Sequence, residues 1–206
     1  TGIMAWALLD TARARGSRGV AHTAGDSPLG RMLAQLSLRR RVPMLHVIDR
    51  AEQGEALSGL GATHILNSGS TLFPQQLANS FEQHGISVVI EANAGLNSDL
   101  LLRAMPTGGS LIMCGSQPDV DCTFDPSELV YRHKRLEGFL LSDWLSHAGY
   151  ARVVQAALVV QRLLSNDSRG EAPSLMSLDN YHTALELVFR RRMSPGRILF
   201  VLHRDN

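Results

Sequence analysis

The chain has 206 residues, of which 44% are hydrophobic and 19% are charged, a composition typical of one large globular domain or two small ones. Its 20 basic and 19 acidic residues nearly cancel, so no overall field attracts nucleic acid, an anionic membrane or an acidic substrate, and we expect no nucleic-acid or membrane partner. Two cysteines, Cys114 and Cys122, cannot build a disulfide framework or a four-cysteine zinc site, which favours a reducing, cytoplasmic location.

The first half of the chain alternates between helical and strand-like patterns. Apolar residues at helical spacing over Ile3–Ala14 precede a short apolar run at Gly19–Thr23, and because the chain starts with Thr1 so close to this helix, we expect a fragment or processed product. Further helices are expected at Pro28–Leu38, Ala51–Leu60, Phe73–Gln83 and Ser98–Ala104, and strands at Met44–Ile48, His64–Leu66, Ser87–Ile90 and Ser110–Met113. This order predicts a doubly wound, mostly parallel α/β sheet, the Rossmann fold, with helices on both faces.

The pattern changes after Gly115. We expect a polar loop, then the strand Leu136–Leu141, the long helix Asp143–Leu164, the polar linker Ser165–Ala172, the helix Leu178–Arg190 and the strand Arg197–His203. The sequence therefore predicts a Rossmann domain over residues 1–164 and a linker with a helix–strand extension over residues 165–206.

A glycine loop, Gly25-Asp26-Ser27-Pro28-Leu29-Gly30, lies where the first strand of the repeat ends and a helix begins. A phosphate bound there would meet unpaired backbone N–H groups and the positive end of the helix dipole. Gly25 allows a tight turn, Gly30 allows close packing of helix and strand, and Pro28 suits the first helical turn. Ser27 stands where the middle glycine of the fingerprint usually lies. The alternative is a turn that uses glycine for packing only.

Asp49 and Arg50 follow the next strand, about 20 residues after the glycine loop, where an adenosine ribose is read. A carboxylate there accepts hydrogen bonds from the ribose hydroxyls, whereas a guanidinium pairs with a 2′-phosphate. The alternative is two solvated charges on a surface turn.

Several segments in this order resemble the zinc-independent quinone-reductase and 2-enoyl thioester reductase branch of the medium-chain dehydrogenase/reductase family. The segments are His22-Thr-Ala-Gly-Asp-Ser-Pro-Leu-Gly-Arg-Met-Leu, Arg50-Ala-Glu-Gln, Leu60-Gly-Ala-Thr-His-Ile-Leu-Asn, Ala104-Met-Pro, Leu129-Val-Tyr-Arg-His-Lys-Arg-Leu-Glu-Gly-Phe-Leu-Leu-Ser-Asp-Trp, Tyr181-His-Thr-Ala-Leu-Glu-Leu and Gly196-Arg-Ile-Leu-Phe. The resemblance runs nearly from end to end of the chain.

The resemblance implies a cofactor site of NADP(H), with NAD possible. It implies pyrophosphate contacts from Gly25, Ser27, Pro28, Leu29 and Gly30, ribose contacts from Asp49, Arg50, Asn93 and Ala94, and nicotinamide contacts from Cys114, Gly115, Phe139 and Leu140. Ala94 departs from the family, which usually has a glycine there.

The resemblance also implies a homodimer through the edge strand of residues 136–141 and a quinone or enoyl substrate. Relatives place a GroES-like domain before this region, and it supplies most of the substrate pocket. We therefore expect hydride transfer to an activated C=C bond or a quinone in the intact enzyme, and a catalytically incomplete chain with no catalytic residue and no metal site of its own.

Other patterns are weaker. Tyr131 and Lys134 are three positions apart, whereas the short-chain dehydrogenase pair requires four, and the histidines His22, His46 and His64 have no paired metal spacing. The arginine runs 39–41 and 190–192 end predicted helices, where cations complement the dipole. An S-adenosylmethionine-dependent methyltransferase and a non-catalytic dinucleotide-sensing or scaffold module remain the alternative functions.

Overall fold

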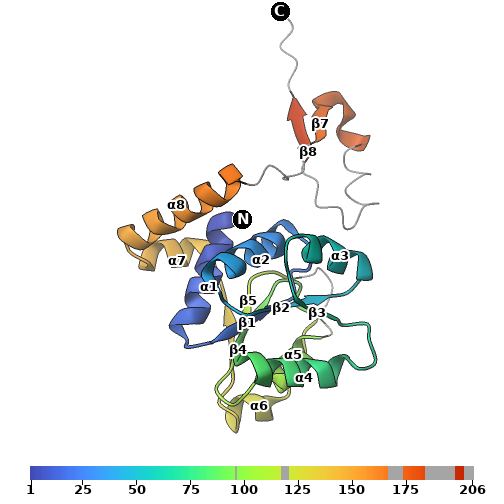
Figure 1. The fold of residues 1–206 in the computed structure, drawn as a ribbon, viewed down its shortest axis with the longest axis vertical. Helices are drawn as coiled ribbons and strands as arrows, with labels where there is room; N and C mark the ends of the chain where they lie inside the picture. The colour runs from blue at the N-terminus through green and yellow to red at the C-terminus, as the bar shows by residue number, and fades with distance from the viewer. Residues whose placement is uncertain (96, 117–120, 167–173, 184–197, 202–206) are drawn as a thin grey trace, which may run out of the picture. The chain divides into compact units, whose positions relative to one another are not determined.

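The computed structural model describes residues 1–206 except residues 96, 117–120, 167–173, 184–197 and 202–206. The chain divides into two compact units, Thr1–Gln161 and Arg162–Asn206. A six-stranded sheet lies in the first unit, and a two-stranded sheet lies in the second (Figure 1). The functional division of the chain at residue 164 stays a prediction. None of the helices in the described ranges has both the length and the apolar character that crossing a bilayer demands.

Six parallel strands form the large sheet, in the order β3-β2-β1-β4-β5-β6. Their bounds are β1 Gly19–His22, β2 Met44–Ile48, β3 His64–Asn67, β4 Ile86–Glu91, β5 Ser110–Met113 and β6 Arg135–Gly138. Every residue of β1 and β2 is buried, as expected of strands covered by helices on both faces. The predicted doubly wound parallel sheet is confirmed.

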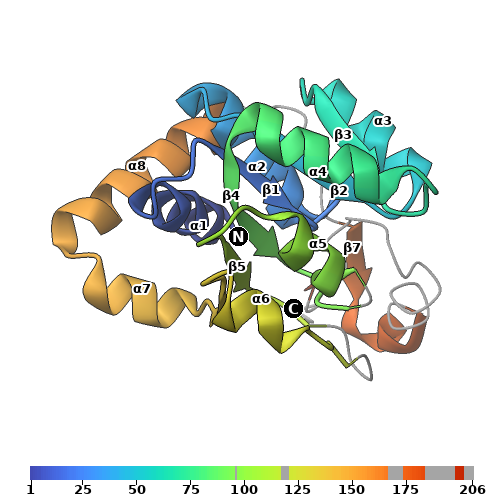
Figure 2. The ribbon, with the colours of Figure 1, turned by 90° about the horizontal axis from the view of Figure 1, so that it is seen from below.

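Helices cover both faces of this sheet. On one side lie α1 Gly2–Ala14, α2 Pro28–Arg40 and α3 Ala51–Gly59, and on the other lie α4 Phe73–His84 and α5 Ser98–Ala104 (Figures 1 and 2). The α4 and α5 side buries Leu77, Phe81 and Leu101 against Val89 of the central strand β4. On the opposite face, Ile48 of β2 packs with Ala34 and Leu57. Helices therefore cover both faces of the sheet, so a ligand can reach the sheet only at the ends of its strands.

The edge strand is shorter than predicted. Leu136–Leu141 was expected to be extended, but β6 ends at Gly138, and Leu141 begins the helix α7 Leu141–His147. The backbone N–H of Phe139 still donates to the Met113 carbonyl at 2.8 Å, after which Leu140 caps the helix. Asp143 lies in the first turn of α7, where a carboxylate favours the positive end of the helix dipole.

The prediction of a single helix over Asp143–Leu164 is wrong. The segment is two helices, α7 and α8 Tyr150–Asn166, separated by Gly149 in the left-handed region with φ of 75°. This is the conformation in which glycine commonly ends a helix, because it has no Cβ to clash.

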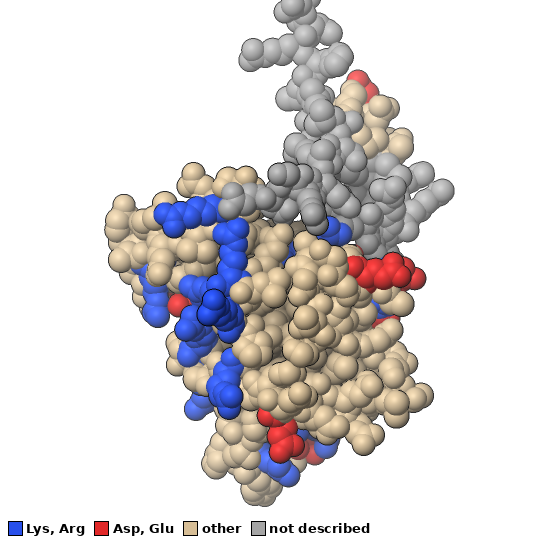
Figure 3. Space-filling view, viewed as in Figure 1, with Lys and Arg blue, Asp and Glu red and all other residues tan. Residues whose placement is uncertain are grey.

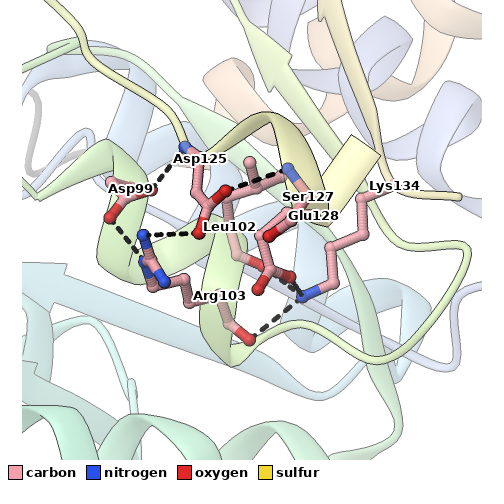
Figure 4. A network of polar contacts seen from close by, with 7 residues as sticks. All are labelled: Asp99, Leu102, Arg103, Asp125, Ser127, Glu128 and Lys134. Atoms are coloured by element: carbon pink, nitrogen blue, oxygen red, sulfur yellow. Dashed lines mark hydrogen bonds and ion pairs between the residues drawn. The ribbon is translucent and has the colours of Figure 1, made fainter. Parts of the chain in front are cut away.

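A short helix, α6 Pro126–Val130, interrupts the segment that was expected to be a loop. The Asp125 side chain caps it by accepting from the Ser127 N–H at 2.9 Å, and Pro126 occupies the first turn. The buried Lys134 ammonium donates to the carbonyls of Leu102 and Arg103, at 2.8 and 3.0 Å, and lies 2.6 Å from Glu128 Oε2 (Figure 4). This network joins the end of α5, the helix α6 and the start of β6.

The second unit contains an unexpected strand. β7 Ser174–Ser177 pairs in parallel with β8 Ile198–Val201. The 3-10 helix η1 Leu178–Asn180 directly follows β7. Ser165 and Asn166, predicted as linker, belong to α8. Residues 167–172 of the expected linker, 184–190 of the expected last helix, and 197, 202 and 203 of the expected last strand lie outside the described residues.

Candidate functional site

A crevice opens at the carboxyl ends of the central strands. Its cavity of about 280 Å³ is lined by Thr23 after β1, Asp49 after β2, Ser68 after β3, and Glu91 and Asn93 at the end of β4, among others. The sheet order reverses between β1 and β4, which are neighbours although β2 and β3 lie between them in the sequence. Open α/β sheets bind ligands at such a switch point, because the loops from the two halves diverge there.

The glycine loop follows Thr23, which lines this crevice, and it has the geometry that a phosphate-binding turn requires. Gly25 has φ of 52°, and a Cβ at Gly30 would lie only 1.9 Å from the Gly25 carbonyl oxygen. Ser27 caps α2 by accepting from the Gly30 N–H at 3.2 Å, and Pro28 occupies the first turn. Both glycines are therefore structurally required, and α2 directs its positive end at the loop.

The anion that Asp26 adds to the loop has a cationic neighbour. Arg31 Nη2 lies 3.9 Å from Asp26 Oδ2, and Arg31 Nε donates to the Asp26 carbonyl at 2.9 Å. The guanidinium weakens the field that the carboxylate would otherwise present to a bound phosphate.

Asp49 and Arg50 lie together at the end of β2. The Asp49 side chain is 55% exposed and lines the crevice, and Arg50 Nε lies 3.7 Å from Asp49 Oδ1. Arg50 Nε is shielded from solvent and has no hydrogen-bond partner among the described residues, so it retains a donor for a ligand.

Gln53 connects the glycine loop with the end of β2, a role that the sequence did not suggest. Its Oε1 accepts from the Asp49 N–H at 3.1 Å, and its Nε2 would lie 3.0 Å from a Cβ at Gly25. The residue is 5% exposed, although it belongs to the polar start of α3. The buried amide fixes the two loops against each other.

The turn after β4 forms another wall of the crevice. Asn93 Nδ2 donates to the Thr23 carbonyl at 2.9 Å, and Ala94 has a positive φ of 32°. Ala94 therefore takes the backbone region that the usual glycine would enter without a steric cost. Glu91, buried beneath this turn, was not among the predicted site residues.

Cys114 and Gly115 follow β5 beside this turn. A Cβ at Gly115 would lie 2.2 Å from the Ala92 carbonyl oxygen, so a glycine is required for the two loops to approach. Burial, with a smaller contribution from the charge of Glu91, raises the pKa of the Cys114 thiol to about 12. The thiol is protonated at neutral pH and is not an activated nucleophile.

Phe139 and Leu140 follow β6 and do not line the crevice described above. Leu140 is 65% exposed, which leaves its side chain free to contact a ligand or another surface. The fold thus brings the predicted residues of β1, β2, β4, β5 and β6 to one edge of the sheet, because the carboxyl ends of parallel strands share that edge.

Two buried histidines support the start of the glycine loop. His22 Nε2 and His46 Nδ1 are 2.6 Å apart, and His22 Nδ1 accepts from the Ala24 N–H at 3.1 Å. Burial, and then the neighbouring His46, hold the pKa of His22 well below its ordinary value. Burial, and then His64, lower the pKa of His46 to about 4. The neutral pair therefore contributes a donor and an acceptor, not a charge.

Within the described ranges, no three histidine, cysteine, aspartate or glutamate side chains converge as a metal site would need.

Comparison with known proteins identifies a family and several relatives. Residues 28–158 match the family model described as zinc-binding dehydrogenase. The mitochondrial enoyl-[acyl-carrier-protein] reductase of Bos taurus is 23% identical over 197 residues, which cover 93% of this chain and 53% of that protein. That of Mus musculus is 24% identical over 198 residues, with the same coverage.

Solved structures share the fold. A protein classed as an NADPH:quinone reductase from Mesorhizobium loti superposes with a TM-score of 0.81 at 24% identity, covering 96% of this chain and 57% of that one. CurA from Vibrio vulnificus, solved in complex with NADPH, superposes with a TM-score of 0.73 at 18% identity, covering 99% and 63%. The chain spans about half the length of the curated relatives it matches.

Proposed function

This chain belongs to the zinc-binding dehydrogenase family, and from that membership we propose that it is the NADP(H)-binding part of a reductase in the zinc-independent, medium-chain branch. The observation that carries the proposal is the crevice at the switch point of the sheet, together with the glycine loop that follows its lining residue Thr23, in which a Cβ at Gly30 would collide with the backbone of Gly25. Such a loop keeps N–H groups at the start of a helix close to a diphosphate.

Each of the predicted site residues has a role in this proposal. Gly25, Ser27, Pro28, Leu29 and Gly30 hold the pyrophosphate, and Asp49 with Arg50 flanks the adenosine ribose. Asn93 and Ala94 contact the second ribose. Cys114, Gly115, Phe139 and Leu140 lie toward the nicotinamide. When bound, NADPH supplies the hydride, and the chain's own residues bind the cofactor, orient it and exclude water from it.

The proposed acceptor is an activated C=C bond or a quinone. Support comes from relatives named as enoyl-[acyl-carrier-protein] and NADPH:quinone reductases. We assign the crevice residues to the donor only: the pKa of the Cys114 thiol is raised, and the buried Glu91 carboxylate already accepts hydrogen bonds from the turn after β4. We propose that the remaining half of such a reductase provides the acceptor pocket, and that this chain alone transfers hydride slowly or not at all.

The test is a fluorescence titration of the purified chain with NADPH, followed by NADPH oxidation with quinones and 2-enoyl thioesters. We expect saturable binding and little turnover, since hydride transfer requires both reactants to be held at near-attack distance in a dry site. Failure to bind any dinucleotide would refute the proposed cofactor site. Robust saturable turnover would refute the proposal that this chain alone is catalytically incomplete. Tight binding of S-adenosylmethionine instead would favour the methyltransferase alternative. If the full-length protein binds NADPH but reduces none of these acceptors, a sensing or scaffold role would be favoured.

A second copy of the chain is the proposed partner. β6 is the edge strand of the sheet that the described residues form, so its outer backbone groups can pair with the same strand of a symmetry mate. Among the relatives, one solved 2-enoyl thioester reductase is a heterodimer of Etr1p and Etr2p from Candida tropicalis. Light scattering should give the mass of a dimer at micromolar concentration, and a monomer at high micromolar concentration would contradict this proposal.

The two free cysteines are in keeping with the reducing cytoplasm as the proposed location.

A further inference from the structure

Glu91, the last residue of β4, is a carboxylate in an almost fully buried position at the floor of the crevice, 2% exposed. Its Oε1 atom accepts hydrogen bonds from Thr23 Oγ1 at 2.5 Å and from the backbone N–H groups of Asn93 and Ala94, each at 3.0 Å. Its Oε2 atom accepts from Ser98 Oγ at 3.4 Å. All of these donors are neutral. One carboxylate therefore contacts the end of β1, the turn after β4 and the first turn of α5.

The groups that Glu91 contacts also hold one another. Thr23 Oγ1 accepts from the Ala92 N–H at 2.9 Å, and Ser98 Oγ accepts from the Gly95 N–H at 3.0 Å. Ala94, within this turn, has the positive φ that a residue with a Cβ adopts only at a steric cost. The backbone N–H groups of residues 92–95 therefore all donate to side chains outside the turn. Those of Asn93 and Ala94 donate to Glu91, and those of Ala92 and Gly95 donate to Thr23 and Ser98, whose hydroxyl groups in turn donate to Glu91.

We propose that Glu91 is a positioning residue, whose carboxylate holds the turn of residues 92–95 in the backbone conformation that receives the dinucleotide. This inference rests on the cofactor-binding function proposed above. Glu91 lines the crevice, as do Thr23 and Asn93, which it fixes. What matters is the place of the acceptor oxygen and not its charge, because every donor on it is an uncharged N–H or O–H group.

That distinction predicts an unusual order among substitutions. In Glu91→Gln the amide oxygen can occupy the place of Oε1 and accept the same three hydrogen bonds, and the NH₂ group can donate to Ser98 Oγ. In Glu91→Asp the charge remains, but the shorter side chain withdraws the oxygens from the turn. Glu91→Ala removes the acceptor altogether and leaves buried N–H groups unpaired.

The first measurement is the Kd of NADPH, by fluorescence titration of the purified chain. We expect Glu91→Gln to stay within about threefold of the wild-type Kd. Glu91→Ala and Glu91→Asp should raise the Kd by about tenfold or more, because apparent affinity falls with the fraction of molecules that hold the binding conformation. The matched control is Glu128→Ala, which removes a carboxylate from the polar network of α6, away from the crevice. Each protein is titrated at the same number of degrees below its own melting temperature, so that lost stability does not affect the comparison. Under these conditions the Glu128→Ala control should keep the wild-type Kd.

The second measurement is amide hydrogen exchange at Asn93 and Ala94 in the absence of cofactor. Exchange should be faster in Glu91→Ala and Glu91→Asp than in the wild type and in Glu91→Gln. If the wild type binds no dinucleotide, the proposed function fails, and the exchange rates still decide whether Glu91 holds the turn. If Glu91→Ala does not fold, the comparison of Glu91→Asp with Glu91→Gln decides.

Two results would overturn the inference. One is a Glu91→Gln variant that binds as weakly as Glu91→Ala, since charge would then be what matters. The other is a pair of Asp and Ala variants whose Kd and exchange rates match those of the Glu128→Ala control.

Discussion

At the scale of single residues, we expect Arg50 to be the side chain that distinguishes the two nicotinamide dinucleotides. Its shielded Nε has no hydrogen-bond partner among the described residues, and its nearest acidic neighbour is Asp49 at 3.7 Å. A guanidinium binds a 2′-phosphate through charge-assisted hydrogen bonds worth about 1.5 to 3 kcal/mol each before losses.

We expect Arg50→Ala to weaken NADPH binding by about tenfold or more, while NADH binding changes little. Calorimetric titration with both cofactors measures the ratio. Arg39→Ala, in the exposed last turn of α2, is the control and should leave both affinities unchanged. Equal affinities of the wild type for the two cofactors, or an equal loss of both in Arg50→Ala, would contradict the expectation.

Gly30 is the glycine whose replacement should be most damaging. A Cβ there would lie 1.9 Å from a backbone oxygen that no side-chain movement can relieve. Gly30→Ala should lower stability by about 2 to 3 kcal/mol, which is roughly 5 to 10 °C in melting temperature, and abolish NADPH binding.

Gly59→Ala is the matched control, because a Cβ at Gly59 in α3 meets nothing within 4 Å. Alanine in a helix should leave the melting temperature unchanged or slightly raised. Thermal unfolding followed by circular dichroism compares the two. A Gly30→Ala protein that melts like the Gly59→Ala protein would show that the loop is not as tight as described.

At the scale of secondary-structure elements, the polar network around Lys134 replaces apolar packing where α5, α6 and β6 meet (Figure 4). Its ammonium is fully buried, whereas Arg103, in the same network, has a side chain that is 47% exposed and pairs with Asp99 and Asp125. Buried and exposed ion pairs can therefore be compared within a few residues.

Lys134→Ala should cost about 3 kcal/mol or more, because it leaves Glu128 and two carbonyl groups without their partner in a buried place. Arg103→Ala should cost much less than Lys134→Ala, because water solvates the exposed carboxylates that remain. Urea unfolding gives both values. Equal losses in the two variants would mean that burial does not decide the strength of this network.

The boundaries of elements show what the sequence could and could not reveal. Met44–Ile48, Ser98–Ala104 and Ser110–Met113 were predicted to the residue, because apolar runs are bounded there by proline, glycine or polar residues. The apolar Leu140 and Leu141 made β6 look longer than it is, and only backbone geometry reveals that Gly149 divides the last long helix. Helical periodicity tolerates one glycine and gives no sign of its φ.

The candidate site could be predicted where it depends on local sequence and not where it depends on distant contacts. The glycine loop and Asp49 with Arg50 stand out because their spacing along the chain has physical meaning. Glu91 and Gln53 do not, because their partners Thr23 and Gly25 lie in segments that only the fold brings near. The pairing of His22 with His46 was hidden for the same reason.

At the scale of the whole molecule, this histidine pair makes stability depend on acidity. Both rings are held neutral in the folded state, with pKa values below the ordinary 6.5, while an unfolded chain takes up protons at that value. The unfolded state therefore binds more protons, and stability falls as the pH drops below 6.5 and toward 4. Above 6.5 this contribution is fully present and constant.

We expect His46 alone to account for about 3 kcal/mol between pH 6.5 and 4, since each unit corresponds to about 1.4 kcal/mol for one fully shifted group. Urea unfolding across this range measures the slope. A His22→Asn, His46→Gln double variant should have a flatter profile below 6.5 and a parallel one between about pH 7 and 8. An unchanged acid slope in the double variant would exclude the pair as its source.

The hydrogen bond between Thr23 and Glu91 joins residues 68 positions apart, and that between Asn93 and Thr23 spans 70. During synthesis the glycine loop is therefore made long before the strand that completes its crevice. Closing so long a loop costs chain entropy before any contact compensates for it, so we expect the pairing of β1 with β4 to form slowly and late in folding. A dinucleotide that contacts both the glycine loop and the turn after β4 stabilises only those molecules in which β1 and β4 are already paired. At 100 times its Kd it would add about 2.7 kcal/mol to the folded state, so the cellular supply of cofactor would help to set how long each molecule survives proteolysis.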